Sequence, residues 1–370
     1  MAQHISTRTY FLRLAVVAAA YALAAYLGLS LIPTEGSGAS LVWPSAAIGI
    51  AALYFWGPGM WPAVTLSFFA LLLSRDTLPP FAAAAALANT LESLTVVYVL
   101  RNIGFSPLLS RLRDSVGLML SAFIGSFISA TVIATAVLLF GDSAMPFNTA
   151  LWAGIWVGHT VSILTFAPFA LRWLARPLFT KTKAELVEGA LVFGTLATLT
   201  YLIYWTPYGS VGNISLIYIA VLFYIWASLR TGPRGIALAL ALTGAIAATG
   251  VFFGYGPISQ ATNLASALFS IQVLIGTLSV IFLLFTSITE ERKEAVIKLE
   301  HHVGQLESAL ERIRSEDQAK SDFIAILAHE LRNPLSPILS GLEILKSQHA
   351  GPQDVVRMMG AHVHTIARLL

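Results

Sequence analysis

The chain begins with long apolar segments and changes near residue 289 to an amphipathic, charged pattern. A membrane-spanning helix needs roughly 20 apolar residues, and eight segments before this point have that character. They are Tyr10–Ile32, Pro79–Leu100, Ser115–Phe140, Thr149–Leu171, Leu186–Trp205, Ile214–Leu229, Gly235–Phe253 and Leu264–Ile288. The pattern predicts an all-α fold, a polytopic transmembrane helix bundle followed by cytosolic helices.

Two shorter apolar segments, Leu41–Trp56 and Met60–Leu73, are separated by the turn Gly57-Pro58-Gly59. They form either two short spans or one re-entrant hairpin, so we predict ten spans, with eight as the alternative. Both counts are even and place the two ends of the body on the same side. We expect the Trp43-Pro44 and Trp61-Pro62 pairs to be interfacial anchors beside helix starts.

Composition supports a membrane body. The chain is 56% hydrophobic and only 11% charged, whereas soluble domains carry about 25% charged residues. With no cysteine, disulfides, thiol catalysis and cysteine-ligated metals are excluded. When the N-terminus is placed inside, Arg75 is the one basic residue near a span end that falls outside. The net charge of +3 therefore reflects basic cytosolic loops, not nucleic-acid binding.

A few polar residues lie inside the predicted spans. Glu92 sits mid-span with Asn89 one turn before it, and His159 lies near Ser162. Ionisable groups within a membrane are costly and usually face the bundle interior. They form either a ligand or proton site, or an interhelical hydrogen bond that fixes packing. Both interpretations stay open at the level of sequence.

Four stretches of the body resemble the membrane-associated sensor domain of the first type, which is found ahead of bacterial histidine kinases and cyclic-dinucleotide enzymes. They are Val42–Val64, Ala88–Leu94, Gly154–Phe169 and Trp226–Ala239. The similarity extends over essentially Tyr10 to Thr289. It departs at Gly158-His159, where this family is expected to have Gly-Asp. The resemblance implies a sensor, but the sequence does not identify its stimulus, for which a small molecule and a membrane protein are the candidates.

The region after Ile288 predicts a coiled coil. Its apolar residues recur at spacings of three and four, as in the seam of a parallel two-stranded coil: Val296, Leu299, Val303, Leu306, Leu310 and Ile313. The alternative is a single amphipathic helix lying on the body. Asp317 and Lys320 fall on seam positions and weaken the coil locally. The seam resumes with Ile324, Leu327 and Leu331, which places His329 on the outermost face.

The stretch FIAILAHELRNPL, Phe323–Leu335, resembles the phosphoacceptor box of sensor histidine kinases. The resemblance implies that His329 receives the γ-phosphoryl group of ATP and that Glu330 orients the ring and accepts its proton. Asn333 would position a water that hydrolyses the phosphoaspartate of a response regulator. The alternative, a plain surface histidine, does not explain six matching neighbours. Pro334 is expected to bend the helix just beyond this site.

The predicted domains are a membrane sensor at 1–289, a coiled-coil linker at 290–320 and a dimerization and histidine-phosphotransfer domain at 321–370. Gln348–Gln353 predicts a turn, and Asp354 is expected to cap a second helix. No phosphate-cradling Gly-rich loop or Asp-x-Gly lid motif follows. We therefore expect a fragment that lacks the ATP-binding domain and is inactive alone. We predict no metal or cofactor within it, since ATP and magnesium belong to the complete kinase.

The leading hypothesis is the sensor region of a two-component histidine kinase in the bacterial inner membrane, with both termini cytoplasmic. Its expected partners are a second copy of the chain, a response-regulator receiver domain and the lipid bilayer. The alternatives are a transporter-like protein and a membrane module that docks to a partner protein. Glu92 and His159 would suit a transporter, while solute flux or a co-purifying partner would separate these classes.

Overall fold

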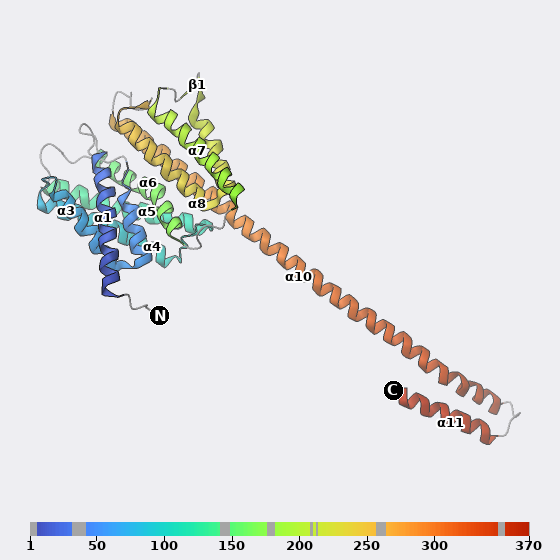
Figure 1. Ribbon diagram of the computed structural model, residues 1–370. Coiled ribbons are helices and arrows are strands. Elements are labelled where there is room, and N and C mark those ends of the chain that lie inside the picture. Colours follow the sequence, from blue (N-terminus) through green and yellow to red (C-terminus); the bar gives the residue numbers. More distant parts are fainter. Residues whose placement is uncertain are drawn as a thin grey trace. The chain divides into compact units, whose positions relative to one another are not determined.

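The computed structural model describes residues 6–31, 42–140, 149–175, 182–207, 210–211, 214–256, 264–346 and 352–369. It divides into two compact units, Met1–Lys293 and Glu294–Leu370. The elements of the first unit are α1 (Thr7–Ser30), α2 (Ser45–Trp56), η1 (Pro58–Met60), α3 (Trp61–Leu73), α4 (Pro79–Asn102), α5 (Leu112–Phe140), α6 (Thr149–Leu174), α7 (Lys183–Trp205), β1 (Ser210–Val211), β2 (Ile214–Ser215), α8 (Leu216–Phe252) and the start of α10 (Leu264–Lys346). The all-α prediction is confirmed (Figure 1).

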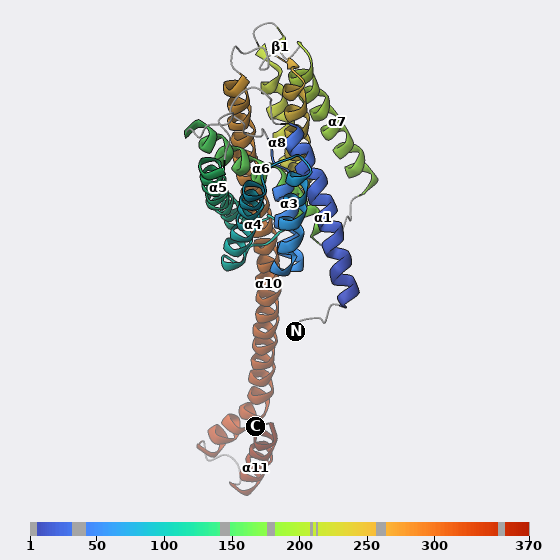
Figure 2. The ribbon, with the colours of Figure 1, turned by 90° about the vertical axis from the view of Figure 1, so that its left-hand side faces the viewer.

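Within the described ranges, seven helices are long and apolar enough to cross a membrane: α1, α4, α5, α6, α7, α8 and α10. They pack around two large apolar cores, and a smaller third core lies between α5 and α6. One core is formed by the helices from α1 through α6, and the other is formed mainly by α7, α8 and the first part of α10. The two cores meet along α6, where Thr165 Oγ1 and Ser279 Oγ of α10 are 3.1 Å apart. Figure 2 shows α7 and α8 beside this part of α10.

Helix α8 is a hairpin of two helical halves. Gly232 has φ 64° and ψ −160°, a backbone conformation that essentially only glycine adopts. The Tyr224 hydroxyl donates to Thr243 Oγ1, 19 residues along the chain. Residues so separated would be about 28 Å apart in a straight helix, so the chain folds back at Gly232. Two segments were predicted here, but the first starts later than expected, because Ile214 and Ser215 pair with β1 as strand β2.

Helices α2 and α3 form a second, shorter hairpin. Its turn uses Gly57 at φ 96°. A Cβ on Gly49 would lie 3.4 Å from Val64, and the rings of Trp43 and Phe68 are 5.4 Å apart, so the two helices run antiparallel. The helices have 12 and 13 residues and are about 18–20 Å long, shorter than a hydrocarbon core of about 30 Å. When the two halves of α8 are counted separately, the described residues contain eight long segments and this hairpin. The total is ten spans if the hairpin crosses the membrane and eight if it is re-entrant, which are the two predicted counts.

Arg13 and Arg101 lie at one end of the bundle, whereas Arg75, which contacts Tyr26 and Ser30 near the end of α1, lies at the other. Arg13 lies over the ring of Trp56, 5.5 Å from its centroid. Arg101 Nη2 donates to the carbonyls of Leu53 and Tyr54, at 3.0 Å each. These contacts tie the start of α1, the tip of the α2–α3 hairpin and the end of α4 together. An antiparallel arrangement of the segments requires this clustering.

The second unit contains the remainder of α10 and helix α11 (Pro352–Leu369). Helix α10 stays helical through Pro334 and ends at Lys346. The cap predicted at Asp354 is wrong, because α11 begins at Pro352 and Asp354 lies in its first turn. Proline suits the first helical position, since its fixed φ matches the helix and its missing N–H costs nothing there. Residues 348–351 of the predicted turn lie outside the described residues.

Candidate functional site

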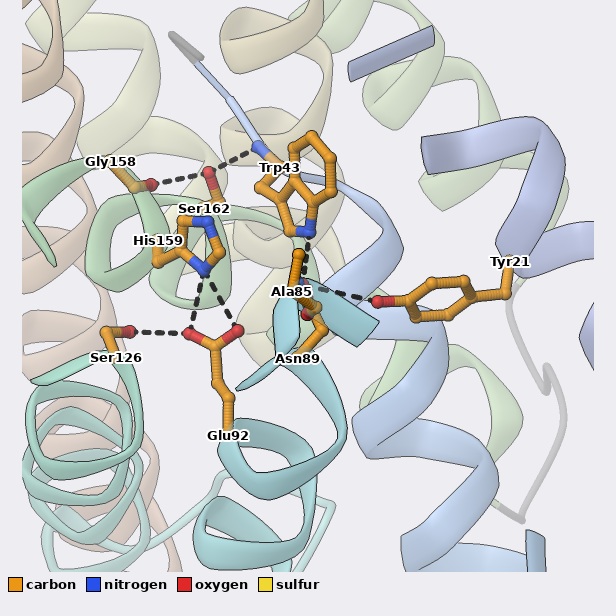
Figure 3. Close-up of polar contacts among 9 residues, drawn as sticks. All are labelled: Tyr21, Trp43, Ala85, Asn89, Glu92, Ser126, Gly158, His159 and Ser162. Carbon is orange, nitrogen blue, oxygen red and sulfur yellow. Dashed lines mark hydrogen bonds and ion pairs between the residues drawn. The ribbon is translucent and has the colours of Figure 1, made fainter. Parts of the chain in front are cut away.

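Three membrane helices bring a carboxylate, an imidazole and a hydroxyl together inside the first unit (Figure 3). Glu92 comes from α4, Ser126 from α5 and His159 from α6. His159 Nδ1 lies 2.9 Å from Oε2 and 3.1 Å from Oε1 of Glu92, and Ser126 Oγ donates to Oε1 at 3.0 Å. Glu92 is fully buried and His159 is 7% exposed. The carboxylate is therefore held by side chains of two other helices.

A second polar centre lies one turn earlier on α4, at Asn89. Its Oδ1 accepts from Trp43 Nε1 at 2.7 Å and from the Tyr21 hydroxyl at 3.3 Å. Its Nδ2 donates to the Ala85 carbonyl at 3.0 Å. Asn89 thus connects α4 to α1 and to the residues just before α2. No partner of Asn89 could be identified from the sequence, and the structure supplies three: Trp43, Tyr21 and Ala85.

Trp43 joins the two centres. Its indole stacks on the imidazole of His159, with centroids 5.6 Å apart and planes 11° apart. Its backbone N–H donates to Ser162 Oγ at 2.6 Å, and that hydroxyl donates to the Gly158 carbonyl. Trp43 was predicted to be an interfacial anchor, and this is wrong, since it is only 5% exposed. A buried indole N–H needs an acceptor, and Asn89 provides one inside the bundle.

The resulting cluster, called here the polar network, consists of Tyr21, Trp43, Asn89, Glu92, Ser126, His159 and Ser162. It links α1, α4, α5, α6 and the segment that enters α2. Among the described residues, no three His, Cys, Asp or Glu side chains gather as metal ligands would. The interhelical hydrogen bond required by the packing interpretation of Glu92 and His159 is present. A role in binding a ligand or a proton stays a prediction.

The predicted phosphoacceptor residues lie on the surface of α10 in the second unit. His329, Glu330 and Asn333 are all exposed, while Leu327 and Leu331 are partly covered. Residues four apart on a helix share a face, so Asn333 lies next to His329 along the helix. Glu330 is the immediate neighbour in sequence and points about 100° away around the axis. An exposed imidazole at this position is accessible to another protein or domain.

The chain therefore combines a helical membrane body containing a buried polar network with a helix that presents an exposed histidine. Residues 12–293 match the model of the MASE1 family, and residues 319–370 match that of the His Kinase A (phospho-acceptor) domain. Because the first match spans most of the chain, the protein belongs to the MASE1 family.

Two curated relatives are similar over short stretches. Sensor histidine kinase TmoS of Ectopseudomonas mendocina is 46% identical over 76 residues, 20% of this chain and 8% of the relative. Sensor histidine kinase AruS of Pseudomonas aeruginosa is 34% identical over 68 residues, 18% of this chain and 7% of the relative. The matched stretches thus span less than a tenth of either relative. No solved structure matches the chain.

Proposed function

We propose that these 370 residues form the sensing and phosphoacceptor part of a two-component sensor histidine kinase. The proposal is supported by the MASE1 match of the body, the phospho-acceptor match of the C-terminal part and the printed names of the two relatives. We place the protein in a bacterial inner membrane with both termini cytoplasmic, because the basic residues near span ends, Arg75 excepted, are expected on one side. The observation that carries the proposal is the exposure of His329 on the same helix that forms the last apolar segment.

The proposed reaction is phosphoryl transfer to His329. A neutral imidazole nitrogen is a competent nucleophile at cytosolic pH. It forms an N–P bond with the γ-phosphorus of ATP while the bond to the bridging oxygen breaks and ADP leaves. Glu330 takes the proton that the imidazole loses. The phosphoryl group then passes to an aspartate of a response regulator, and Asn333, beside His329 on the helix, positions the water that later hydrolyses the phosphoaspartate.

We propose that the protein works as a homodimer joined along the seam of α10. Six seam side chains are between 45% and 65% exposed in the single chain: Val296, Leu299, Val303, Leu306, Leu310 and Ile313. An apolar stripe of this length on an otherwise charged helix is typical of a coiled coil, which buries it against a second copy. The stimulus would act through the polar network, with Asn89, Glu92 and His159 as its centre, and reach His329 along α10.

The test is a phosphorylation assay of the purified chain with a matching ATP-binding domain added separately, because phosphoryl transfer also needs a cradle for ATP and magnesium. We expect an acid-labile, base-stable label that His329→Gln abolishes. Glu330→Gln should slow labelling, and Asn333→Ala should spare labelling but reduce dephosphorylation of the response regulator. His301→Gln, an exposed histidine elsewhere on α10, is the matched control and should label normally.

Without the added domain we expect no label, because only the nucleophile is present in these residues. A label that persists in His329→Gln would contradict the assignment of the phosphoacceptor. Robust labelling of the chain without the added domain would contradict the assignment of ATP binding to a separate domain. Circular dichroism of each variant separates loss of chemistry from loss of fold.

A further inference from the structure

Two charged residues interrupt the apolar seam of α10. Asp317 and Lys320 occupy consecutive seam positions, both in the second unit. We propose that Asp317 of each copy in the homodimer pairs with Lys320 of the other copy, and that this pairing selects a second copy of the chain in parallel register as the partner. The inference rests on the homodimer proposed above and names the contact that selects its partner.

The first observation is that the helix runs unbroken through both residues. Helix α10 is continuous here, and its two internal prolines come only after the seam has resumed at Ile324. The spacing of three and four therefore keeps Asp317 and Lys320 on the same face as the apolar seam residues before and after them. Both charged residues are exposed in the single chain, and Ile324 beyond them is 56% exposed. The face that carries the charges is thus available to another chain.

The second observation is that the two side chains do not pair with each other within one chain. They are three positions apart, a spacing at which opposite charges on a helix are neighbours. Glu290 and Lys293 have the same spacing on α10 and do pair, at 2.8 Å. In the described part of the chain, neither Asp317 nor Lys320 forms an ion pair or a side-chain hydrogen bond. Both charges therefore remain free to pair with a second copy.

A parallel coil brings these charges together across the interface. Each seam side chain inserts between four residues of the facing helix, and for Asp317 these include Lys320 of the other copy. Lys320 in turn lies beside Asp317 of the other copy. The four side chains, called here the charged layer, comprise two carboxylates and two ammonium groups with no net charge (2 − 2). Each charge in the layer therefore has an opposite charge from the facing helix.

The charged layer discriminates against other registers. All other seam residues from Val296 to Leu331 are apolar. A shift of one heptad would place Asp317 opposite Leu310 or Ile324, and a charge covered by apolar side chains without its partner is strongly unfavourable. A polar residue at a seam position specifies register in this way, at a cost in stability. The two helices run parallel because both copies leave the same face of one membrane.

The experiment co-expresses two full-length copies that carry tags of different size and reads the dimers from disulfide crosslinks. The chain has no cysteine of its own, so Val303→Cys in every copy reports a parallel dimer in register. Asp317→Lys alone puts four cations in the charged layer, and Lys320→Asp alone puts four anions there. Each variant alone should crosslink about tenfold less than the unmodified chain, equivalent to about 1.4 kcal/mol. Co-expressed, the two variants have matching charges and should form the heterodimer in preference to either homodimer.

Recovery in the mixture protects the test against misfolding, because two misfolded variants would not restore each other. The matched control is Glu311→Lys, which reverses a charge on the same helix outside the seam and should crosslink as the unmodified chain does. Normal crosslinking of each variant alone, statistical mixing, or no recovery in the mixture would overturn the pairing and leave the homodimer standing. If the unmodified chain with Val303→Cys gives no crosslink, the homodimer itself is contradicted and the pairing with it.

Discussion

The contact between Glu92 and His159 leads to a prediction about the stability of the bundle. The substitution Glu92→Gln should lower it in the unmodified chain and raise it in a chain that carries His159→Ala. Glu92 is fully buried and accepts hydrogen bonds from His159 and Ser126. Replacing Glu92 by Gln in the unmodified chain removes a charge-assisted hydrogen bond. In a His159→Ala background it instead removes a buried carboxylate that has lost its main partner. The first change should destabilise the bundle and the second should stabilise it.

The magnitudes follow from burial. A hydrogen bond to a charged group contributes about 1.5–3 kcal/mol, so Glu92→Gln alone should cost that amount. Removing one partner of a buried charge pair costs about 3–5 kcal/mol, which sets the expected loss for His159→Ala. The double variant should be more stable than His159→Ala, because the uncharged amide is cheaper to leave buried. The interaction energy of the cycle should therefore exceed about 2 kcal/mol.

The assay is reversible unfolding in mixed micelles, titrated with sodium dodecyl sulfate and followed by far-UV circular dichroism. The cavity left by His159→Ala occurs in both variants that carry it, so it cancels in the double-mutant cycle. Ser126→Ala is the control for an ordinary hydroxyl donor and should cost about 1 kcal/mol. An interaction energy near 0.6 kcal/mol, the average for interhelical hydrogen bonds within a membrane, would refute the view that a buried charge is being compensated.

Three further predictions test the architecture. A reporter that is active only in the periplasm should be silent when fused after Leu370, because basic helix ends stay inside; activity there would reverse the proposed orientation. Replacing Leu306 and Leu310 by Lys puts like charges in the seam and should abolish crosslinking of the dimer through cysteines introduced between Glu300 and Glu311, whereas surviving crosslinks would exclude the coil. Gly232→Ala should cost about 1–3 kcal/mol in micelle unfolding because φ is +64° there, while Gly194→Ala, with open space around it, should cost nothing; equal effects would contradict the α8 hairpin.

The apolar pattern was sufficient to predict the membrane helices. Among the described residues, every predicted apolar segment contains a helix, and most helices begin or end within a few residues of the expected position. The errors fall where local chemistry overrides hydropathy. Proline starts α11 before Asp354, and two residues before α8 pair as a strand. Hydropathy reports burial in lipid and carries no information about such ends.

The polar network was only partly visible in the sequence. Glu92, Asn89 and His159 stood out because ionisable or amide side chains are rare inside apolar spans. Tyr21 and Ser126 did not, because tyrosine and serine are common in membrane helices, and Trp43 was assigned to the membrane interface instead. Their contacts join residues 34 to 68 positions apart, and no local pattern indicates which side chains meet. Tertiary packing decides these partners.

The packing of α5 against α4 shows how small residues make the network possible. A Cβ on Gly125 would lie 2.8 Å from Val96 Cγ2 and 3.1 Å from the Glu92 carbonyl, so only glycine permits this approach of the two backbones. The next residue, Ser126, then reaches the Glu92 carboxylate. In lipid, apolar contact alone does not favour one helix partner over another, and close approach and hydrogen bonds select the arrangement. Gly125 and Glu92 therefore act together: the glycine brings the helices close, and the carboxylate fixes which faces meet.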